Sequence, residues 1–353
     1  MKRVEALDFA RVLSMLAVIV IHVTAPYMGW NSDVTVCGMN LAFILNQACR
    51  FSVPLFILLS GTALGLKDGT VSAAPFWKKR FAKVGIPYVV WFVLYELNNH
   101  DFRLSAYLED ISAAPAAHLR RFLLGQAAPH LYFISILLQL YLLHPLIEKA
   151  VRKAPRTTLW AALAVTCTAQ LLFDLGREGV WLLPSAVAPY WWMLFPVWLA
   201  YFVLGACCSG EVLSKTEEVC KRNGPMIVGA TAAALVAFVL RANATGNLSA
   251  VKLSLLPVTV LVLLGAMALW KLMDRWSAVR TINAFLAKHS MTVYFCHVLV
   301  LGLIRDRAVF YTGMRGMLLL VAADFIFSLA LAVVIDTSLQ WSRHFFQRRN
   351  HHD

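Results

Sequence analysis

Long apolar runs recur from one end of this sequence to the other, and they constrain the fold more than any other feature. A run of about twenty apolar residues crosses a hydrocarbon core of about 30 Å as an α-helix, at about 1.5 Å per residue. Of the 353 residues 60% are apolar and only 14% are charged, which leaves too little polar surface for a soluble protein of this length. The sequence therefore predicts an all-α integral membrane protein.

We expect about ten transmembrane helices in one bundle, forming a single membrane-embedded domain over residues 1–353 with no separate soluble domain. Glu96 and Asn98 weaken the third span, and the segment around 103–125 is a candidate for an additional interfacial helix. The expected spans, with approximate bounds, are 9–29, 41–66, 84–99, 131–149, 157–173, 190–208, 225–241, 252–273, 284–304 and 316–341.

The net charge of +13 is explained by membrane topology. Basic residues cluster in short loops between the apolar runs, as the positive-inside rule requires, and this places both termini in the cytoplasm. We therefore expect membrane lipids and no nucleic acid as partners. The seven cysteines are scattered, with no metal-ligand or disulfide spacing, and no metal is expected. The densest inner cluster is Lys67, Lys78, Lys79, Arg80 and Lys83.

Ionisable residues inside spans are costly and usually face the protein interior or a water-filled cavity. Arg11 and His22 lie eleven residues apart on the first span, which puts them on one helix face, about 16 Å apart along the axis. Asp8 can pair with Arg11. One interpretation is a snorkelling arginine and a hydrogen-bonded interior histidine. The functional alternative is a cation at the inner mouth with a titratable base deeper in the membrane.

Other polar residues in or beside spans have both structural and functional interpretations. His297 follows Tyr294 near the middle of the ninth span, and an interhelical hydrogen bond would explain it. His130 opens the fourth span at the outer interface, where histidine is an ordinary belt residue. Arg50, within the second span, needs a partner or a cavity. Gly61, after Ser60, permits close approach of two helices.

Five motifs occur in a fixed order along these spans. Together they resemble membrane-bound acyltransferase family 3, the O-acyltransferases of bacterial surface polysaccharides and related molecules. The resemblance covers essentially the whole chain. The motifs are Leu7–Arg11 with Ile21-His22, Val53–Phe56 with Ser60-Gly61, Lys79-Arg80 through Ile86–Tyr88, His130–Phe133 with Pro145, and Ser290 through Tyr294 to His297.

The resemblance implies that Arg11 and His22 are essential. It also implies that Arg80 is the first member of an inner-surface Arg-x-x-Arg pair linked to acyl-CoA, although Lys83 replaces the second arginine and loses its bidentate fork. The implied protein is a multi-pass O-acyltransferase of the bacterial cytoplasmic membrane. Acetyl-CoA is its default donor, and a cell-surface glycan, glycolipid or lipid-linked sugar is its acceptor.

The mechanism expected from these residues brings the phosphates of acyl-CoA to Lys79, Arg80 and Lys83. His22 acts as general base or acyl carrier. Arg11 and His297 are the other expected catalytic residues. The residues expected to orient the substrate are Asp8, Arg50, His130 and Tyr294.

Other functions fit parts of the pattern. A polytopic transporter or flippase also has many spans with buried arginine and histidine, and a non-catalytic membrane module could bind a small ligand. A haem protein would use His130 and His144, which lie fourteen residues apart on one expected span.

Overall fold

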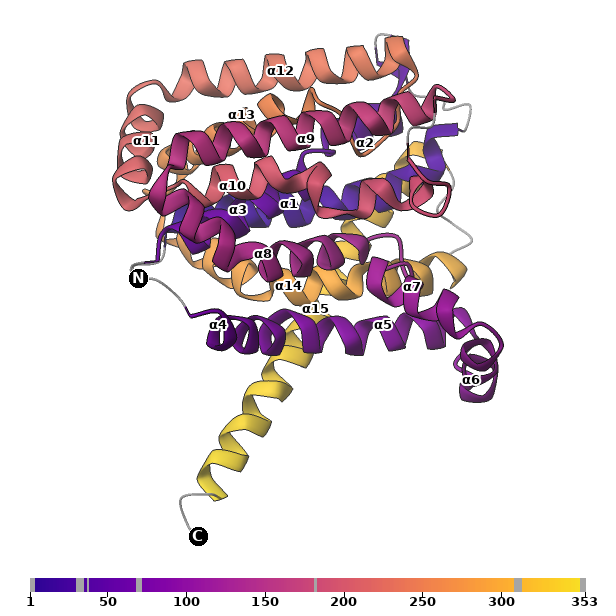
Figure 1. The fold of residues 1–353 in the computed structure, drawn as a ribbon. Helices are drawn as coiled ribbons and strands as arrows, with labels where there is room; N and C mark the ends of the chain where they lie inside the picture. Colours follow the sequence, from indigo (N-terminus) through magenta and orange to yellow (C-terminus); the bar gives the residue numbers. More distant parts are fainter. Residues whose placement is uncertain are drawn as a thin grey trace. The chain divides into compact units, whose positions relative to one another are not determined.

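The computed structural model describes residues 4–29, 35–36, 38–67, 72–180, 183–307 and 313–349, and nearly all of them are helical (Figure 1). The elements are α1 (Glu5–Thr24), η1 (Ala25–Gly29), β1 (Thr35–Val36), β2 (Met39–Asn40), α2 (Leu41–Ala48), α3 (Ser52–Gly65), α4 (Ala73–Arg80), η2 (Phe81–Gly85), α5 (Ile86–Asn99), α6 (Leu104–Ala113), α7 (Pro115–Leu124), α8 (Tyr132–Lys153), α9 (Pro155–Arg177), η3 (Ala188–Met193), η4 (Phe195–Trp198), α10 (Leu199–Ala206), α11 (Gly210–Arg222), α12 (Gly224–Thr245), α13 (Leu255–Met273), α14 (Ser277–Arg307) and α15 (Gly313–Arg349). The predicted all-α membrane class is confirmed.

Eight helical stretches of the described chain are long and apolar enough to cross a membrane. A ninth span exists if the pair Phe195–Ala206 and Gly210–Arg222, which is bent by 86°, counts as one. The eight are Glu5–Met28, Leu41–Gly65, Tyr132–Lys153, Pro155–Gly176, Gly224–Thr245, Leu255–Met273, Ser277–Arg305 and Gly313–Ser342.

The expected span at 84–99 differs from these helices. Its α-helix, α5, has 14 residues and continues without a break from η2 and α4, but this stretch is not among the described helices that are long and apolar enough to cross a membrane. The candidate helix within 103–125 is present as two helices, α6 and α7, joined at Ala114. Arg121 of α7 holds this region together by donating to Glu96 of α5, at 3.2 Å, and to Asp110 of α6.

One compact unit comprises Val53–Arg222 and Ser249–Val260. Within it α8, α9 and α10 pack against one another (Figure 1). The helices α3 and α10 approach so closely that a Cβ atom at Gly61 would overlap the carbonyl oxygen of Phe202. A Cβ atom at Gly205 would likewise overlap the carbonyl oxygen of Leu58. The predicted use of Gly61 in close helix packing is therefore confirmed.

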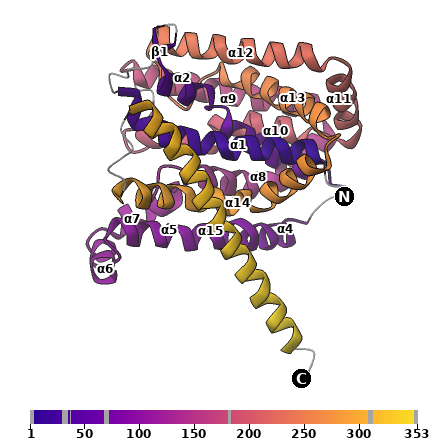
Figure 2. The ribbon, with the colours of Figure 1, turned by 180° about the vertical axis from the view of Figure 1, so that it is seen from behind.

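The second unit comprises residues 2–52, 223–248 and 261–353. Helix α1 contacts α2, α14 and α15, and α15 also packs along α14 (Figure 2). The side-chain amide of Asn283 donates to the carbonyl of Glu5 at 3.1 Å, which joins α14 to the start of α1. The C-terminal part of α15 extends away from the other helices of its unit in both views.

The six cysteines in the described residues have free thiols, and Cys37 lies outside those residues. The single-domain organisation and the cytoplasmic position of both termini stay predictions.

Candidate functional site

The sequence-predicted pair at the start of α1 is formed. Arg11 donates from Nη1 to Oδ1 of Asp8 at 2.9 Å, three residues earlier on the helix. The Asp8 side chain is buried, whereas that of Arg11 is partly exposed. Since α1 runs unbroken from Glu5 to Thr24, Arg11 and His22 keep the expected separation of about 16 Å along the helix axis.

His22 on α1 lies against His297 on α14, with 5.3 Å between the ring centroids. The His297 side chain is completely buried. Its Nδ1 lies 2.7 Å from the carbonyl oxygen of Tyr294. A carbonyl oxygen only accepts hydrogen bonds, so Nδ1 of His297 donates, and in the neutral ring Nε2 carries the lone pair. The structure thus places a second, buried imidazole ring beside His22.

Two more polar groups surround His22 within the same unit. Arg50, just beyond α2, is close enough for its positive charge to act on His22. Asn46 of α2 is completely buried and donates to the carbonyl of Ile21 at 3.0 Å and to Thr24 at 3.1 Å. Sequence analysis missed Asn46, although a buried asparagine four residues before Arg50 in an apolar span was a usable signal.

The predicted basic residues lie on one continuous helical stretch of the other unit. Lys79 and Arg80 end α4, and Lys83 lies in the π-helical turn η2. Arg80 packs against two aromatic rings. Its guanidinium carbon lies 5.4 Å from the centroid of the Phe76 ring and 4.9 Å from that of Tyr141. These cation–π contacts hold Arg80 against α8.

A polar cavity of about 510 Å³ lies beside Arg80. Phe76 links Arg80 to this cavity. The Phe76 ring contacts the Arg80 guanidinium. It also lies against His144, which lines the cavity, with 4.7 Å between the ring centroids. The charged and polar residues of the wall are Lys67, His144, Glu148, Arg152 and Ser209. Arg152 donates to Glu148 at 3.0 Å from Nη2 and 3.2 Å from Nε.

The pKa of Lys67 is affected by the charges of the neighbouring residues. Burial lowers the pKa of its ammonium group, and the charges of Arg80, Lys79 and Lys83 lower the pKa further, against the opposing effect of Glu148. One carboxylate therefore faces a group of cations, which is the charge pattern of a site for a multiply charged anion. Sequence analysis placed Lys67 in the basic cluster but did not predict Arg152 or Glu148 as its neighbours.

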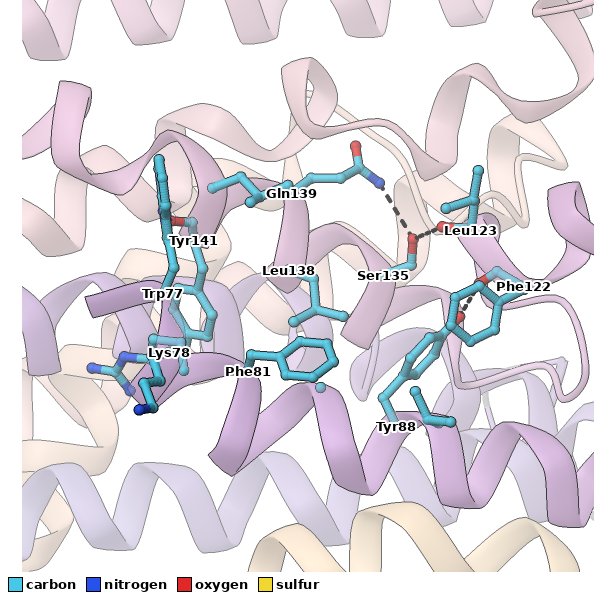
Figure 3. Close-up of a pocket in the computed structure, with 14 residues that line it drawn as sticks. Trp77, Lys78, Phe81, Tyr88, Phe122, Leu123, Ser135, Leu138, Gln139 and Tyr141 are labelled. Carbon is cyan, nitrogen blue, oxygen red and sulfur yellow. Dashed lines mark hydrogen bonds between the residues drawn. The ribbon is translucent and has the colours of Figure 1, made fainter. Parts of the chain in front are cut away.

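A second cavity, of about 600 Å³, has Arg80 among its lining residues (Figure 3). Its walls come from α4, η2 and α5, from the end of α7 and from α8. Most of the lining is aromatic or aliphatic, with Phe81 and Leu138 near the middle of the view and Tyr88 and Phe122 at the right. Its full lining is Trp77, Lys78, Arg80, Phe81, Gly85, Tyr88, Val89, Phe122, Leu123, Ser135, Leu138, Gln139, Tyr141 and Leu142.

The remaining predicted residue, His130, is buried and packs edge-on against Tyr95, with 5.2 Å between ring centroids. Its burial makes it an interior residue rather than the belt residue that the sequence suggested. Elsewhere, ligand atoms of Glu96, Asp110 and His118 lie within 4.8 Å of one another. Arg121 donates hydrogen bonds to the carboxylates of Glu96 and Asp110, so its guanidinium already balances their negative charge.

The predicted site residues thus fall into two groups by unit. Asp8, Arg11, His22, Arg50, Tyr294 and His297 belong to the unit that contains α1 and α14. Lys79, Arg80, Lys83 and His130 belong to the unit that contains α4 and α8.

Comparison with known proteins decides among the functions that such a site allows. The sequence model of a family described as "Acyltransferase domain" matches residues 4–337. The chain belongs to this acyltransferase family. The acyltransferase is also similar to the curated protein "Putative membrane-bound acyltransferase YfiQ" of Bacillus subtilis (strain 168). The two are 22% identical over 306 residues, which cover 84% of this chain and 80% of that protein. No solved structure matches the acyltransferase.

The family resemblance drawn from the five motifs is therefore confirmed, and with it the membrane-bound, multi-pass character of the acyltransferase. Membership supports transferase activity and favours an enzyme over a transporter, a binding module or a haem protein.

Proposed function

We propose that this acyltransferase moves an acyl group from cytoplasmic acyl-CoA to a hydroxyl of a cell-surface glycan, glycolipid or lipid-linked sugar, in a bacterial cytoplasmic membrane. The observation that carries the proposal is the contact of His22 with His297 in a member of an acyltransferase family. O-acyl transfer needs a base for the acceptor hydroxyl, and neutral histidine supplies one near neutral pH.

In the proposed reaction a nitrogen of His22 takes the proton of the acceptor hydroxyl while the hydroxyl oxygen attacks the thioester carbonyl. The tetrahedral intermediate carries a negative charge on its oxygen, which the nearby charge of Arg50 stabilises. Collapse of the intermediate breaks the carbon–sulfur bond and expels the CoA thiolate. The thiolate takes the proton from the imidazolium of His22, so the products are an ester and CoA.

His297 has the role of a positioning residue in this scheme. Its Nδ1–H is held by the Tyr294 carbonyl, so Nε2 is the nitrogen of His297 that can accept a hydrogen bond from His22. Such an acceptor selects the tautomer of His22 whose other nitrogen is basic. The same His22 nitrogen could instead become transiently acylated, as histidine can act as a nucleophile.

The cations around Lys67 and Arg80 support acyl-CoA as the donor. CoA carries several phosphate charges, and arginine and lysine are the residues that bind phosphate best. The phosphates would meet Lys79, Arg80 and Lys83, as the sequence predicted, together with Lys67 and Arg152 on the wall of the polar cavity. No metal is needed in this scheme.

The test is release of the CoA thiol from acyl-CoA by the purified protein in lipid nanodiscs, with and without a polysaccharide or lipid-linked sugar acceptor. We expect acceptor-dependent release by the wild type and a rate lower by about 10²–10⁴-fold in His22→Ala, with unchanged binding of CoA. His100→Ala, which removes a histidine outside the site, is the matched control and should keep the wild-type rate.

A folded His22→Ala protein with normal turnover would contradict the role of His22. If the folded wild type neither bound nor turned over acyl-CoA, the proposed acyltransferase activity would be wrong. A transporter or a ligand-binding module would then be the better interpretation. Acid-quenched wild-type protein that retains label from the acyl group on His22 would identify the acyl-carrier form of the mechanism.

A further inference from the structure

The apolar cavity of Figure 3 has no evident part in proton transfer, and its chemistry is distinct from that of the polar cavity. Its volume of about 600 Å³ lies within the range of small-molecule sites. It is formed by residues of one compact unit. Its lining indicates which ligand chemistry would fit it.

The polar side chains in the lining are already engaged with the protein. Four of them donate hydrogen bonds to backbone carbonyls, so they have little to offer a polar ligand. The donors and their acceptors are Trp77 to Tyr141 at 3.2 Å, Tyr88 to Phe122, Ser135 to Leu123, and Gln139 to Met193 at 3.1 Å. A group such as an amide would lose its hydrogen bonds to water here without replacement, at a cost of about 1–3 kcal/mol or more, whereas a hydrocarbon chain loses none.

Positive charge is confined to one end of the cavity. Figure 3 shows the Lys78 amine beside Trp77 and Tyr141, and Arg80 lies over the Tyr141 ring. The opposite end, at Tyr88 and Phe122, is formed by rings (Figure 3). A cavity with cations at one end and an apolar body matches an amphiphile with an anionic head and a hydrocarbon tail.

The middle of the cavity depends on the π-helical turn η2 and on Gly85. A Cβ atom at residue 85 would lie only 2.5 Å from the Phe81 ring, which is too close for the two to coexist. Glycine at 85 therefore leaves room for Phe81 to fold back along its own helix and line the cavity. Such π-helical turns are often found at functional sites.

We propose that this cavity receives the hydrocarbon chain of the acyl donor, so that the acyltransferase takes acyl-CoA with a medium or long chain in preference to acetyl-CoA. The inference rests on the proposed function, in which the phosphates of the same donor lie among the cations around Lys67 and Arg80. The hydrocarbon chain extends through the cavity toward Tyr88 and Phe122. This replaces the acetyl group that the family resemblance implied.

The test is binding of CoA thioethers that cannot react, with S-ethyl, S-hexyl and S-decyl chains, to the wild-type protein in nanodiscs. A fully buried methylene tightens binding by up to about fourfold, so S-decyl-CoA should bind at least about tenfold more tightly than S-ethyl-CoA. Leu138→Trp, which fills the middle of the cavity, should remove this difference and leave the affinity for S-ethyl-CoA within about twofold.

Leu146→Trp is the matched control, because it makes the same change at an exposed position of α8 outside the cavity. It should keep the full dependence on chain length, which separates binding in the cavity from partition into the nanodisc. Leu142→Trp, at the exposed rim of the cavity, is the second variant if Leu138→Trp does not fold, and should act in the same direction.

Equal affinity for the three thioethers would overturn the inference while leaving CoA binding, and hence the proposed function, intact. An undiminished preference for S-decyl-CoA in folded Leu138→Trp or Leu142→Trp would also overturn it. So would a phospholipid that copurifies with the wild type and is lost in these variants, without any dependence on chain length. Absence of binding by all three thioethers and by CoA would contradict the donor assigned in the proposed function.

Discussion

At the scale of single residues, the contact between His22 and His297 is the most informative feature of this acyltransferase. The two residues come from opposite ends of the sequence, and both were candidates from their positions inside apolar runs. What the structure adds is their proximity and the hydrogen bond that fixes the tautomer of His297. The tautomer decides which ring nitrogen of an imidazole accepts a proton and which one donates.

His297→Ala is expected to lower kcat by about 10–100-fold, because it removes the acceptor that orients His22 but leaves the base itself. KM for acyl-CoA should change by less than about threefold. His297→Gln keeps an acceptor on a side chain of similar reach and should restore part of the rate. Steady-state kinetics of CoA release measures both parameters. Equal losses in the two variants, with reduced thermal stability, would indicate a structural role only.

Lys67 gives a pH prediction. Its pKa is lowered by burial and by Arg80, Lys79 and Lys83, and a lysine binds phosphate only when protonated. Binding of CoA should therefore be strongest below this lowered pKa and weaken as the pH rises through it. The other ionisable groups that line the cavity are Glu148, Arg152 and His144.

The measurement is the CoA dissociation constant between about pH 7 and 10. Lys67→Arg, whose guanidinium does not titrate in this range, should flatten the profile, and Lys67→Gln should weaken binding at every pH. Lys215→Gln, an exposed residue paired with Glu211, is the control. A wild-type profile that Lys67→Arg does not alter would remove Lys67 from the donor site.

At the scale of elements, the packing of α3 on α10 illustrates what small residues do in this fold. Gly61 and Gly205 each face a backbone carbonyl of the other helix, so the two backbones meet without side chains between them. The sequence predicted a close approach at Gly61. It did not identify α10 as the partner, because a pair of small residues carries no information about which helix it meets.

Gly61→Ala should destabilise the protein by about 1–3 kcal/mol, since the added methyl group would overlap backbone that has no rotamer to change. Gly229→Ala on α12 is the matched control, because nothing lies near its added methyl group, and it should be neutral or stabilising by up to about 1 kcal/mol through helix propensity. Thermal unfolding in detergent compares them. Equal melting temperatures for the two variants would show that α3 and α10 do not pack in this way.

The chain from α4 to α7 shows where the prediction of elements was weakest. The predicted span at 84–99 is replaced in the structure by a π-helical turn, α5 and two further helices. Glu96 explains the difference. Its buried carboxylate binds Arg121, and a pair of this kind satisfies a charge that a hydrocarbon core would not.

At the scale of the whole molecule, the distribution of basic residues predicts that both termini are cytoplasmic. Fluorescent-protein fusions at either end should therefore fluoresce, and alkaline phosphatase fused to the C-terminus should be inactive. An active C-terminal phosphatase would mean that the number of spans is odd. The structure would have nine spans if the bent pair Phe195–Ala206 and Gly210–Arg222 crosses the membrane once and α5 does not cross it.

The sequence by itself determined the membrane class, the α-helical architecture, the family and the residues at which chemistry was expected. Each of these depends on local information: an apolar run of sufficient length predicts a span, and an ionisable residue within such a run is too costly to be accidental. The ordered motifs added the family because they combine several such positions on one chain.

Only the tertiary structure decided which of these residues meet. His22 and His297 lie 275 positions apart in sequence, and the two cavities beside Arg80 are walled by α3, α4, α5, α7, α8, α10 and α11. No periodicity in one helix shows which face of another helix it will contact. The physical reason is that interhelical packing in a membrane depends on shape and on hydrogen bonds between distant segments, to which apolar composition contributes no specificity.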